Sequence, residues 1–111
     1  MVTHGANSTR LTAKVDTGAE FCLFSRAHAE TLGIVVESGL LCELRTVNGS
    51  FRAYGHDVRI RVLGIEFDLM AYFAADSSIH RSLLGRRGWL DRVRIGIIDH
   101  DQLLYLSHYD D

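Results

Sequence analysis

The most constraining feature of this sequence is a strict two-residue alternation of apolar and polar side chains near its middle. Charged and apolar residues alternate from 57 to 62, and the pattern resumes from 65 to 71 after Gly64. A period of two is typical of a β-strand that buries one face, whereas an amphipathic helix repeats every 3.6 residues. Because a glycine separates the two runs, we expect two antiparallel strands joined by a tight turn.

Shorter runs of strand-like sequence predict the remaining strands. They lie at residues 10–15, 21–24, 40–47, 82–85, 95–98 and 103–106, and the strand that contains residues 57–62 begins at Ser50 with a break at Gly55. Asn48-Gly49 separates two of them, and this dipeptide is the strongest short-range hairpin signal because both residues tolerate a positive φ. About eight short strands with turn residues every ten or so positions favour an all-β barrel or sandwich, mostly antiparallel.

One or two short helices are expected beside these strands. Ser25 is a suitable N-cap for a helix over residues 26–32, and Gly33 suits the position just beyond its end. Residues 87–92 have room for one or two helical turns.

Composition limits the possible functions. With 111 residues, 47% hydrophobic content and a net charge of −2, the chain forms one ordinary domain and does not favour nucleic acid. No apolar run approaches the ~20 residues of a membrane span, so no membrane contact is expected. Cys22 and Cys42 are too few for a disulfide scaffold, which favours a cytoplasmic location. Residues 1–9 contain little apolar sequence and are interpreted as a flexible or truncated N-terminal arm before a domain at 10–111.

The sharpest chemical signal is the stretch Val15-Asp16-Thr17-Gly18-Ala19, which follows a predicted strand. A turn at this point presents a carboxylate at a strand end, with backbone N–H groups nearby. A second motif, Leu83-Leu84-Gly85-Arg86, precedes the predicted second helix. Its glycine permits a close approach to a neighbouring backbone.

Together these motifs resemble the retropepsin-like (retroviral-type) aspartic proteases, especially bacterial and retroelement-type members. The matching elements are Asp16-Thr17-Gly18-Ala19, a mid-chain hairpin at Asn48-Gly49, and Leu83-Leu84-Gly85-Arg86, in the family's order. The resemblance implies a small antiparallel closed β-barrel of the acid-protease type with one or two short helices. It also implies an aspartic endopeptidase that needs no metal or other cofactor and takes an extended peptide or protein as substrate.

The resemblance further implies a homodimer, because one chain supplies one catalytic aspartate and the mechanism uses two. Asp16 and its counterpart would share a proton and activate a water molecule between them. Thr17, Gly18 and Ala19 would support the active-site loop.

Other residues take roles from the same resemblance. Arg86 would pair with Glu20 behind the loop, Asn48 and Gly49 would form the tip of a flap over the substrate, and Leu83, Leu84 and Gly85 would line or pack the floor. These roles are expectations from the family.

Several readings remain open at this stage. Asp16 also suits a simple turn that hydrogen-bonds its own backbone, and the fold also suits a non-catalytic dimerisation or peptide-binding module. The six histidines have no zinc-type spacing, and Cys22 and Cys42 are expected to be small core residues. The arginines between 81 and 94 are expected to be solvated or ion-paired.

Overall fold

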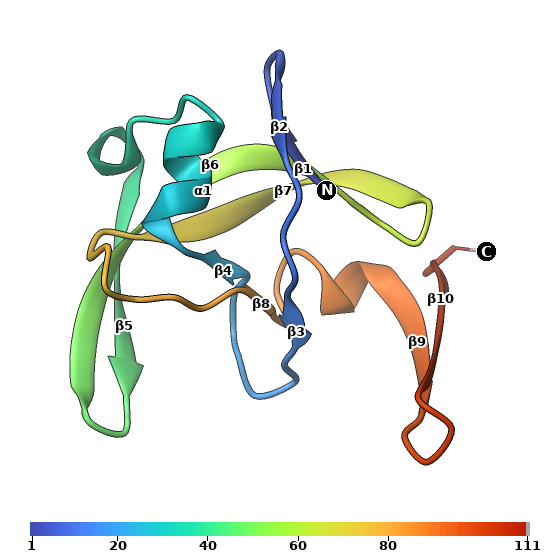
Figure 1. The fold of residues 1–111 in the computed structure, drawn as a ribbon. Helices are drawn as coiled ribbons and strands as arrows, with labels where there is room; N and C mark the ends of the chain where they lie inside the picture. Colours follow the sequence, from blue (N-terminus) through green and yellow to red (C-terminus); the bar gives the residue numbers. More distant parts are fainter. Residues whose placement is uncertain (111) are drawn as a thin grey trace.

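The structure, a computed structural model, describes residues 1–110 and consists mainly of β-strands (Figure 1). Seven strands follow one hydrogen-bonded path in the order β2-β1-β6-β7-β4-β8-β3, and β5 pairs with β6 beside that path. A separate two-stranded sheet contains β9 and β10. The strands are β1 (Val2–His4), β2 (Asn7–Thr9), β3 (Lys14–Val15), β4 (Leu23–Phe24), β5 (Leu40–Thr46), β6 (Gly49–Val62), β7 (Ile65–Ala74), β8 (Leu83–Leu84), β9 (Val93–Ile98) and β10 (Leu103–His108).

The β6–β7 hairpin confirms the alternation that dominates the sequence. The two strands pair antiparallel from Val62↔Ile65 to Ala53↔Ala74. Leu63 and Gly64 form the turn with φ values of 50° and 80°, the conformation of a tight two-residue hairpin loop. The apolar side chains of the alternating runs face the core, including Val58, Ile60, Phe67, Leu69 and Ala71.

The N-terminal residues are ordered, which corrects the expectation of a flexible arm at 1–9. β1 and β2 form a hairpin, and β1 continues the main sheet through the pairs Val2↔Ile60 and Thr3↔Arg59. Val2 is 1% exposed. The burial of Val2 and the pairing of β1 with β6 hold residues 1–9 in place, although their sequence is otherwise polar.

The predicted hairpin at Asn48-Gly49 is present, but its turn lies one residue earlier. β5 and β6 pair down to Thr46↔Gly49, so Val47 and Asn48 are the two turn residues. Gly49 is the first residue of β6, with a φ of 142°. Gly49 therefore provides a positive φ at the first residue of the strand, a conformation that other residues rarely adopt. It is not one of the two turn residues.

The helices are as short as expected. α1 spans Arg26–Thr31 after Ser25, whose side chain makes no capping hydrogen bond, and Gly33 follows with a φ of 72°. Two 3₁₀ turns, η1 (Val36–Ser38) and η2 (Leu90–Arg92), complete the list. η2 is the one turn realised within the predicted helical stretch at 87–92.

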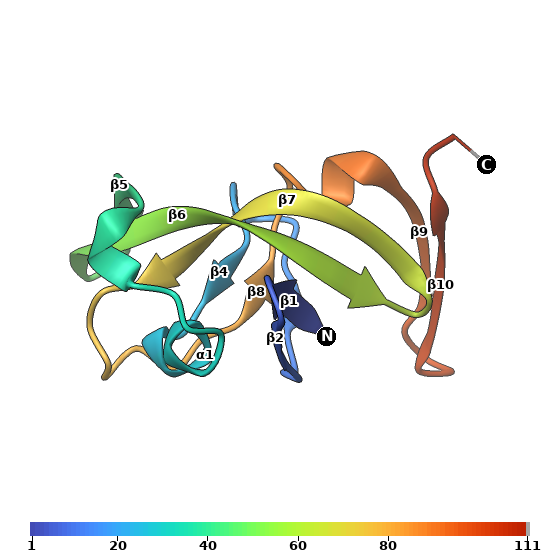
Figure 2. The ribbon, with the colours of Figure 1, turned by 90° about the horizontal axis from the view of Figure 1, so that it is seen from above.

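The main sheet is strongly curled, and its path ends at β2 on one side and β3 on the other. Figure 2 shows β6 and β7 bending across the molecule, with α1 near one end and β9–β10 at the other. This confirms a mostly β fold but not the closed barrel, because residues 1–110 contain no pairing between β2 and β3. The pairing is also not purely antiparallel, since β3 runs parallel to β8 and β4 runs parallel to β7.

The core lies between the curled sheet, α1 and η2. Its largest fully buried side chains are Trp89, Phe24, Phe73 and Leu32. Cys22 is fully buried within it and Cys42 is partly buried, both as free thiols, as expected from the sequence. Within residues 1–110, no helix combines the length and apolar character that a bilayer crossing requires.

Gly85, directly after β8, allows two backbone segments to meet at the centre of the fold. A Cβ at this position would overlap the carbonyl of Phe21 and lie 2.9 Å from the carbonyl oxygen of Ala19. We expect Gly85→Ala to lower the free energy of unfolding by about 2 kcal/mol or more, because a backbone atom cannot move aside cheaply.

The matched control is Gly96→Ala in β9, where a Cβ would lie 3.8 Å from that of Tyr105, an ordinary contact. This variant should change the unfolding free energy by less than about 0.5 kcal/mol. Urea titration measures the free energy of unfolding of both variants. Equal decreases for the two would contradict the conclusion that the close backbone contact requires Gly85.

The two thiols should differ sharply in reactivity. Burial raises the pKa of the Cys22 thiol to about 11, so at pH 8 only about one molecule in a thousand carries its reactive thiolate. We expect a disulfide reagent such as DTNB to titrate one thiol per native chain and two after denaturation. Cys42→Ser should abolish the fast native reaction, and two fast thiols in the native protein would show that Cys22 is accessible.

Candidate active site

The Asp16 loop, residues 16–22, connects β3 to β4. Asp16 begins the loop, and its backbone N–H donates to the carbonyl of Leu84 at 3.0 Å, extending the parallel pairing of β3 with β8. The N–H of Ala19 donates to the Asp16 carbonyl at 3.2 Å and closes a turn. The strand therefore ends at the carboxylate, as the motif predicted.

The Asp16 carboxylate is half-buried and only partly engaged. Its Oδ1 accepts the N–H of Gly18 at 2.9 Å. Among residues 1–110 neither carboxylate oxygen has a further hydrogen-bond or ion-pair partner. A Cβ on Gly18 would lie 3.3 Å from Oδ1, so glycine keeps the surroundings of the carboxylate open. One oxygen is oriented by the loop, and the other is available to a water, a substrate or a second molecule.

The second motif holds the Asp16 loop from behind. Leu83 pairs with Lys14 of β3 and with Leu23 of β4, and Leu84 is buried. The backbone N–H of Arg86 donates to the Ala19 carbonyl at 2.9 Å, and that of Arg87 donates to the Glu20 carbonyl at 2.8 Å. The two sequence motifs, almost 70 residues apart, thus form one backbone framework.

The ion pair behind the loop involves a different arginine from the one expected. Arg87 Nε lies 3.5 Å from Glu20 Oε1, whereas the exposed Arg86 makes no ion pair within residues 1–110. Arg87 is the residue bridged to Phe21, so its side chain leaves the backbone next to the loop. The Arg86–Glu20 pair predicted from the sequence is therefore replaced by Arg87–Glu20, an exposed pair of modest strength.

Sequence reasoning also missed an apolar cluster that connects the Asp16 loop with the β5–β6 hairpin. Phe21 packs on Tyr72 with ring centroids 4.9 Å apart, and Arg87 lies 6.0 Å from the centroid of the Phe21 ring. The other members are Leu23, Ala53, Ala74 and the partly buried Cys42, Leu44, Phe51, Ile79 and Leu83. The alternation of Cys42 and Leu44 in β5 was the signal that could have indicated this cluster.

The β5–β6 hairpin extends away from the sheet on the same side as the Asp16 loop (Figure 1). Its turn residue Val47 is fully exposed, with Asn48 and Gly49 exposed beside it. The expected flap residues are therefore at the end of a projecting hairpin, with Val47 at the tip. Thr17 is exposed in the Asp16 loop, and its hydroxyl has no hydrogen-bond partner within residues 1–110.

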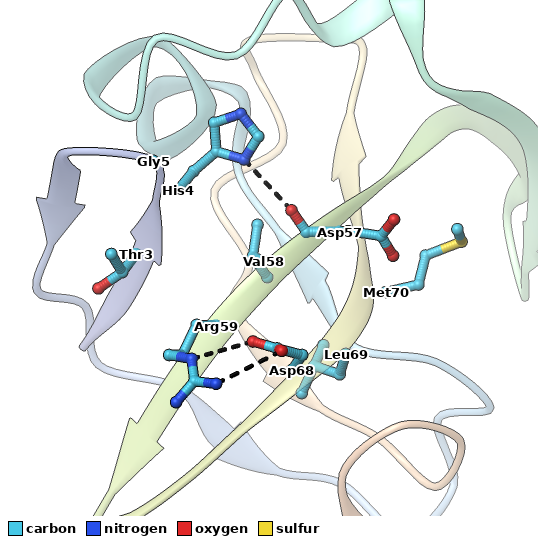
Figure 3. Close-up of a pocket in the computed structure, with 9 residues that line it drawn as sticks. All are labelled: Thr3, His4, Gly5, Asp57, Val58, Arg59, Asp68, Leu69 and Met70. Carbon is cyan, nitrogen blue, oxygen red and sulfur yellow. Dashed lines mark hydrogen bonds and ion pairs between the residues drawn. The ribbon is translucent and has the colours of Figure 1, made fainter.

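A surface hollow of about 560 Å³ lies elsewhere, where β1 crosses β6 and β7 (Figure 3). Its polar groups are largely paired with one another: Arg59 Nε donates to Asp68 at 3.0 Å, and His4 Nδ1 contacts the Asp57 carbonyl at 3.2 Å. No residue of the Asp16 loop lines it. We therefore place the site at the free carboxylate and not at this hollow. Within residues 1–110, no three potential ligand side chains gather as a metal site would require.

Comparisons with known proteins identify the family and a similar fold. The family model described as "Aspartyl protease" matches residues 2–88. Among solved structures, the chain is similar to the EIAV protease complexed with the inhibitor HBY-793, with a TM-score of 0.53 and 23% identity over 67% of this chain and 68% of that one. This likeness shows a shared fold, and no curated protein sequence matches. Because the family match includes both motifs and most of the chain, the chain belongs to the aspartyl protease family, and its fold is similar to that of a retroviral protease.

Proposed function

We propose that two copies of the chain bring their Asp16 loops together and hydrolyse peptide bonds with a water molecule held between the two carboxylates. The observation that carries this proposal is the Asp16 carboxylate, which is anchored on one oxygen and has no partner on the other within residues 1–110. A single carboxylate can accept a proton from water, but polarising the substrate carbonyl requires an acid as well. A second copy supplies that acid without any further residue.

The shared site explains how one residue type performs both roles. Two neighbouring carboxylates do not both ionise easily, so the pair retains one proton and titrates as a unit. The ionised Asp16 takes a proton from water as it attacks the scissile carbonyl carbon. The protonated partner donates a hydrogen bond to the carbonyl oxygen, and a carboxyl group then protonates the departing amine.

The remaining loop residues have supporting roles in this proposal. The free hydroxyl of Thr17 is placed to hydrogen-bond across the dimer, and Gly18 lets the substrate backbone approach the carboxylates. Ala19 and Glu20 accept the backbone N–H groups of Arg86 and Arg87, which fix the loop. The β5–β6 hairpin, with Val47, Asn48 and Gly49 at its end, closes over the bound peptide and limits access of bulk water.

The β9–β10 hairpin exposes apolar side chains to solvent, and this exposure supports the proposed dimer. On one face, Ile97 and Leu104 continue the row of Val93, Ile95 and Leu106 beyond the core and are 58% and 37% exposed. On the other, Ile98, Leu103 and Tyr105 are 44%, 44% and 57% exposed. A two-stranded sheet with two free edges is marginally stable alone. We propose that this hairpin packs on its counterpart and thereby brings the two Asp16 loops face to face.

Asp16→Asn tests the catalytic assignment. The amide is similar in size and still accepts the Gly18 N–H, but it cannot take a proton from water. We expect peptide hydrolysis to fall at least about 10³-fold, with the circular dichroism spectrum and dimer mass unchanged. Asp57→Asn, at an exposed position of β6 outside the β9–β10 hairpin, is the matched control and should retain full activity. Unchanged hydrolysis by Asp16→Asn would exclude the mechanism and favour a non-catalytic peptide-binding module.

Ile97→Asp tests the dimer surface. A charge on this apolar patch should shift the dimer toward monomer by at least tenfold in dissociation constant. Specific activity should then fall at low protein concentration and recover as concentration rises. The control is Val35→Asp, since Val35 is 69% exposed outside the hairpin. Sedimentation velocity measures the masses, and a dimer equally stable in both variants would place the interface elsewhere.

A further inference from the structure

The charges of this chain are divided unevenly between the candidate site and the rest of the molecule. We define the site segments as residues 10–24, 40–55 and 75–88, which contain the Asp16 loop, its backbone anchors and the paired part of the β5–β6 hairpin. They hold seven Lys and Arg residues against four Asp and Glu residues, a net charge of +3. The remaining residues hold five against ten, a net charge of −5. The overall value of −2 conceals this division.

The four acidic side chains of the site segments all have partners within those segments. Asp16 and Asp76 accept backbone N–H groups at 2.9 and 2.8 Å, from Gly18 and Ser78. Glu20 pairs with Arg87 at 3.5 Å. Glu43 accepts the hydroxyl of Ser50 at 3.2 Å.

The cations of the same segments are mostly unpaired. Only Arg87 forms an ion pair within residues 1–110; the other six are exposed and make no side-chain hydrogen bond there. Those six are Arg10, Lys14, Arg45, Arg52, Arg81 and Arg86. By contrast, Arg26 and Arg59 outside the site segments each pair with two acidic residues.

The unpaired cations lie on segments that would contact an extended peptide. Lys14 is two residues before Asp16, and its strand partner Leu83 is two residues after Arg81. Arg45 and Arg52 flank the turn of the projecting hairpin, on the face opposite to Leu44 and Phe51, which pack toward the Asp16 loop. Lys14 and Arg81 are therefore the cations placed beside the candidate site, and the hairpin arginines add positive charge from its outer face.

We infer that the enzyme prefers peptides that carry acidic side chains on either side of the cleaved bond. This inference rests on the proposed function, because it names the substrate class of the same site. Uncompensated positive charge attracts anionic ligands and steers their approach, and a second copy would double it. The peptide's carboxylates would supply the partners that these arginines lack.

A nucleic acid is the competing anionic partner, and the whole-molecule charge disfavours it. Nucleic-acid-binding domains are commonly basic overall, whereas this chain has an isoelectric point of about 6.3 and a net charge of −5 outside the site segments. A long polyanion would meet that repulsion, while a short peptide would meet only the local field.

The experiment begins with a proteome-derived peptide library, which identifies a cleaved core sequence. Three peptides then place Glu, Gln or Lys at the two flanking positions on each side of that core. We expect kcat/KM to be about three- to tenfold higher for the Glu peptide than for the Gln peptide at low salt, and lowest for the Lys peptide. At about 0.5 M salt the difference should shrink below about twofold.

Matched variants locate the effect. Arg81→Gln and Lys14→Gln should each reduce the Glu-to-Gln ratio about twofold, whereas Arg61→Gln, an exposed cation outside the site segments that has no ion pair within residues 1–110, should leave the ratio unchanged. Equal kcat/KM values for all three peptides would overturn the inference while leaving the proposed function intact. Absence of cleavage of any library peptide by a confirmed dimer would instead reject the proposed function.

Fluorescence anisotropy with labelled single-stranded DNA tests the competing partner. We expect no binding at 0.15 M salt. Binding that Lys14→Gln and Arg81→Gln weaken, and that Arg61→Gln does not, would assign the cations to nucleic acid and overturn the inference.

Discussion

The close contact between the backbone at Gly85 and the backbone of Ala19–Phe21 is the constraint on which the site depends. Two consecutive N–H groups, those of Arg86 and Arg87, donate across it to the Ala19 and Glu20 carbonyls. The contact fixes the Asp16 loop through backbone atoms. Because backbone atoms carry the position, the side chains at 16–18 remain available for chemistry, and the Asp16 carboxylate retains an unpartnered oxygen.

Under the proposed mechanism, this arrangement leaves the single chain chemically incomplete. The framework presents one carboxylate per chain, and the fold leaves the β9–β10 hairpin apolar on both faces near its tip. In the proposal, a second copy of the chain covers the apolar hairpin and supplies the second carboxylate. Catalysis and association would then be coupled, so that the concentration of the protein would control its activity.

The sequence predicts those parts of the fold where local and tertiary signals agree. The alternation at 57–62 and 65–71 identifies β6 and β7 because half of each strand is buried. The N-terminal hairpin escapes prediction because its order comes from Val2 and from pairing with β6, which is distant in sequence. The hairpin turn is displaced by one residue because the β5–β6 register, and not the Asn-Gly preference, determines it. Arg87 replaces Arg86 because neither spacing nor composition reveals which side chain leaves the strand toward Glu20.

The charge division links substrate choice to the acidity at which the enzyme works. The proposed dyad needs one proton shared between two carboxylates, a state that both full ionisation and full protonation of the pair remove. Free Asp and Glu side chains in a peptide have pKa values near 4, so they stay ionised only above that range. Attraction of an acidic peptide and a singly protonated dyad therefore coexist only in a limited pH interval. Below it the arginines remain charged but the peptide does not, so the site would lose its preference for acidic peptides.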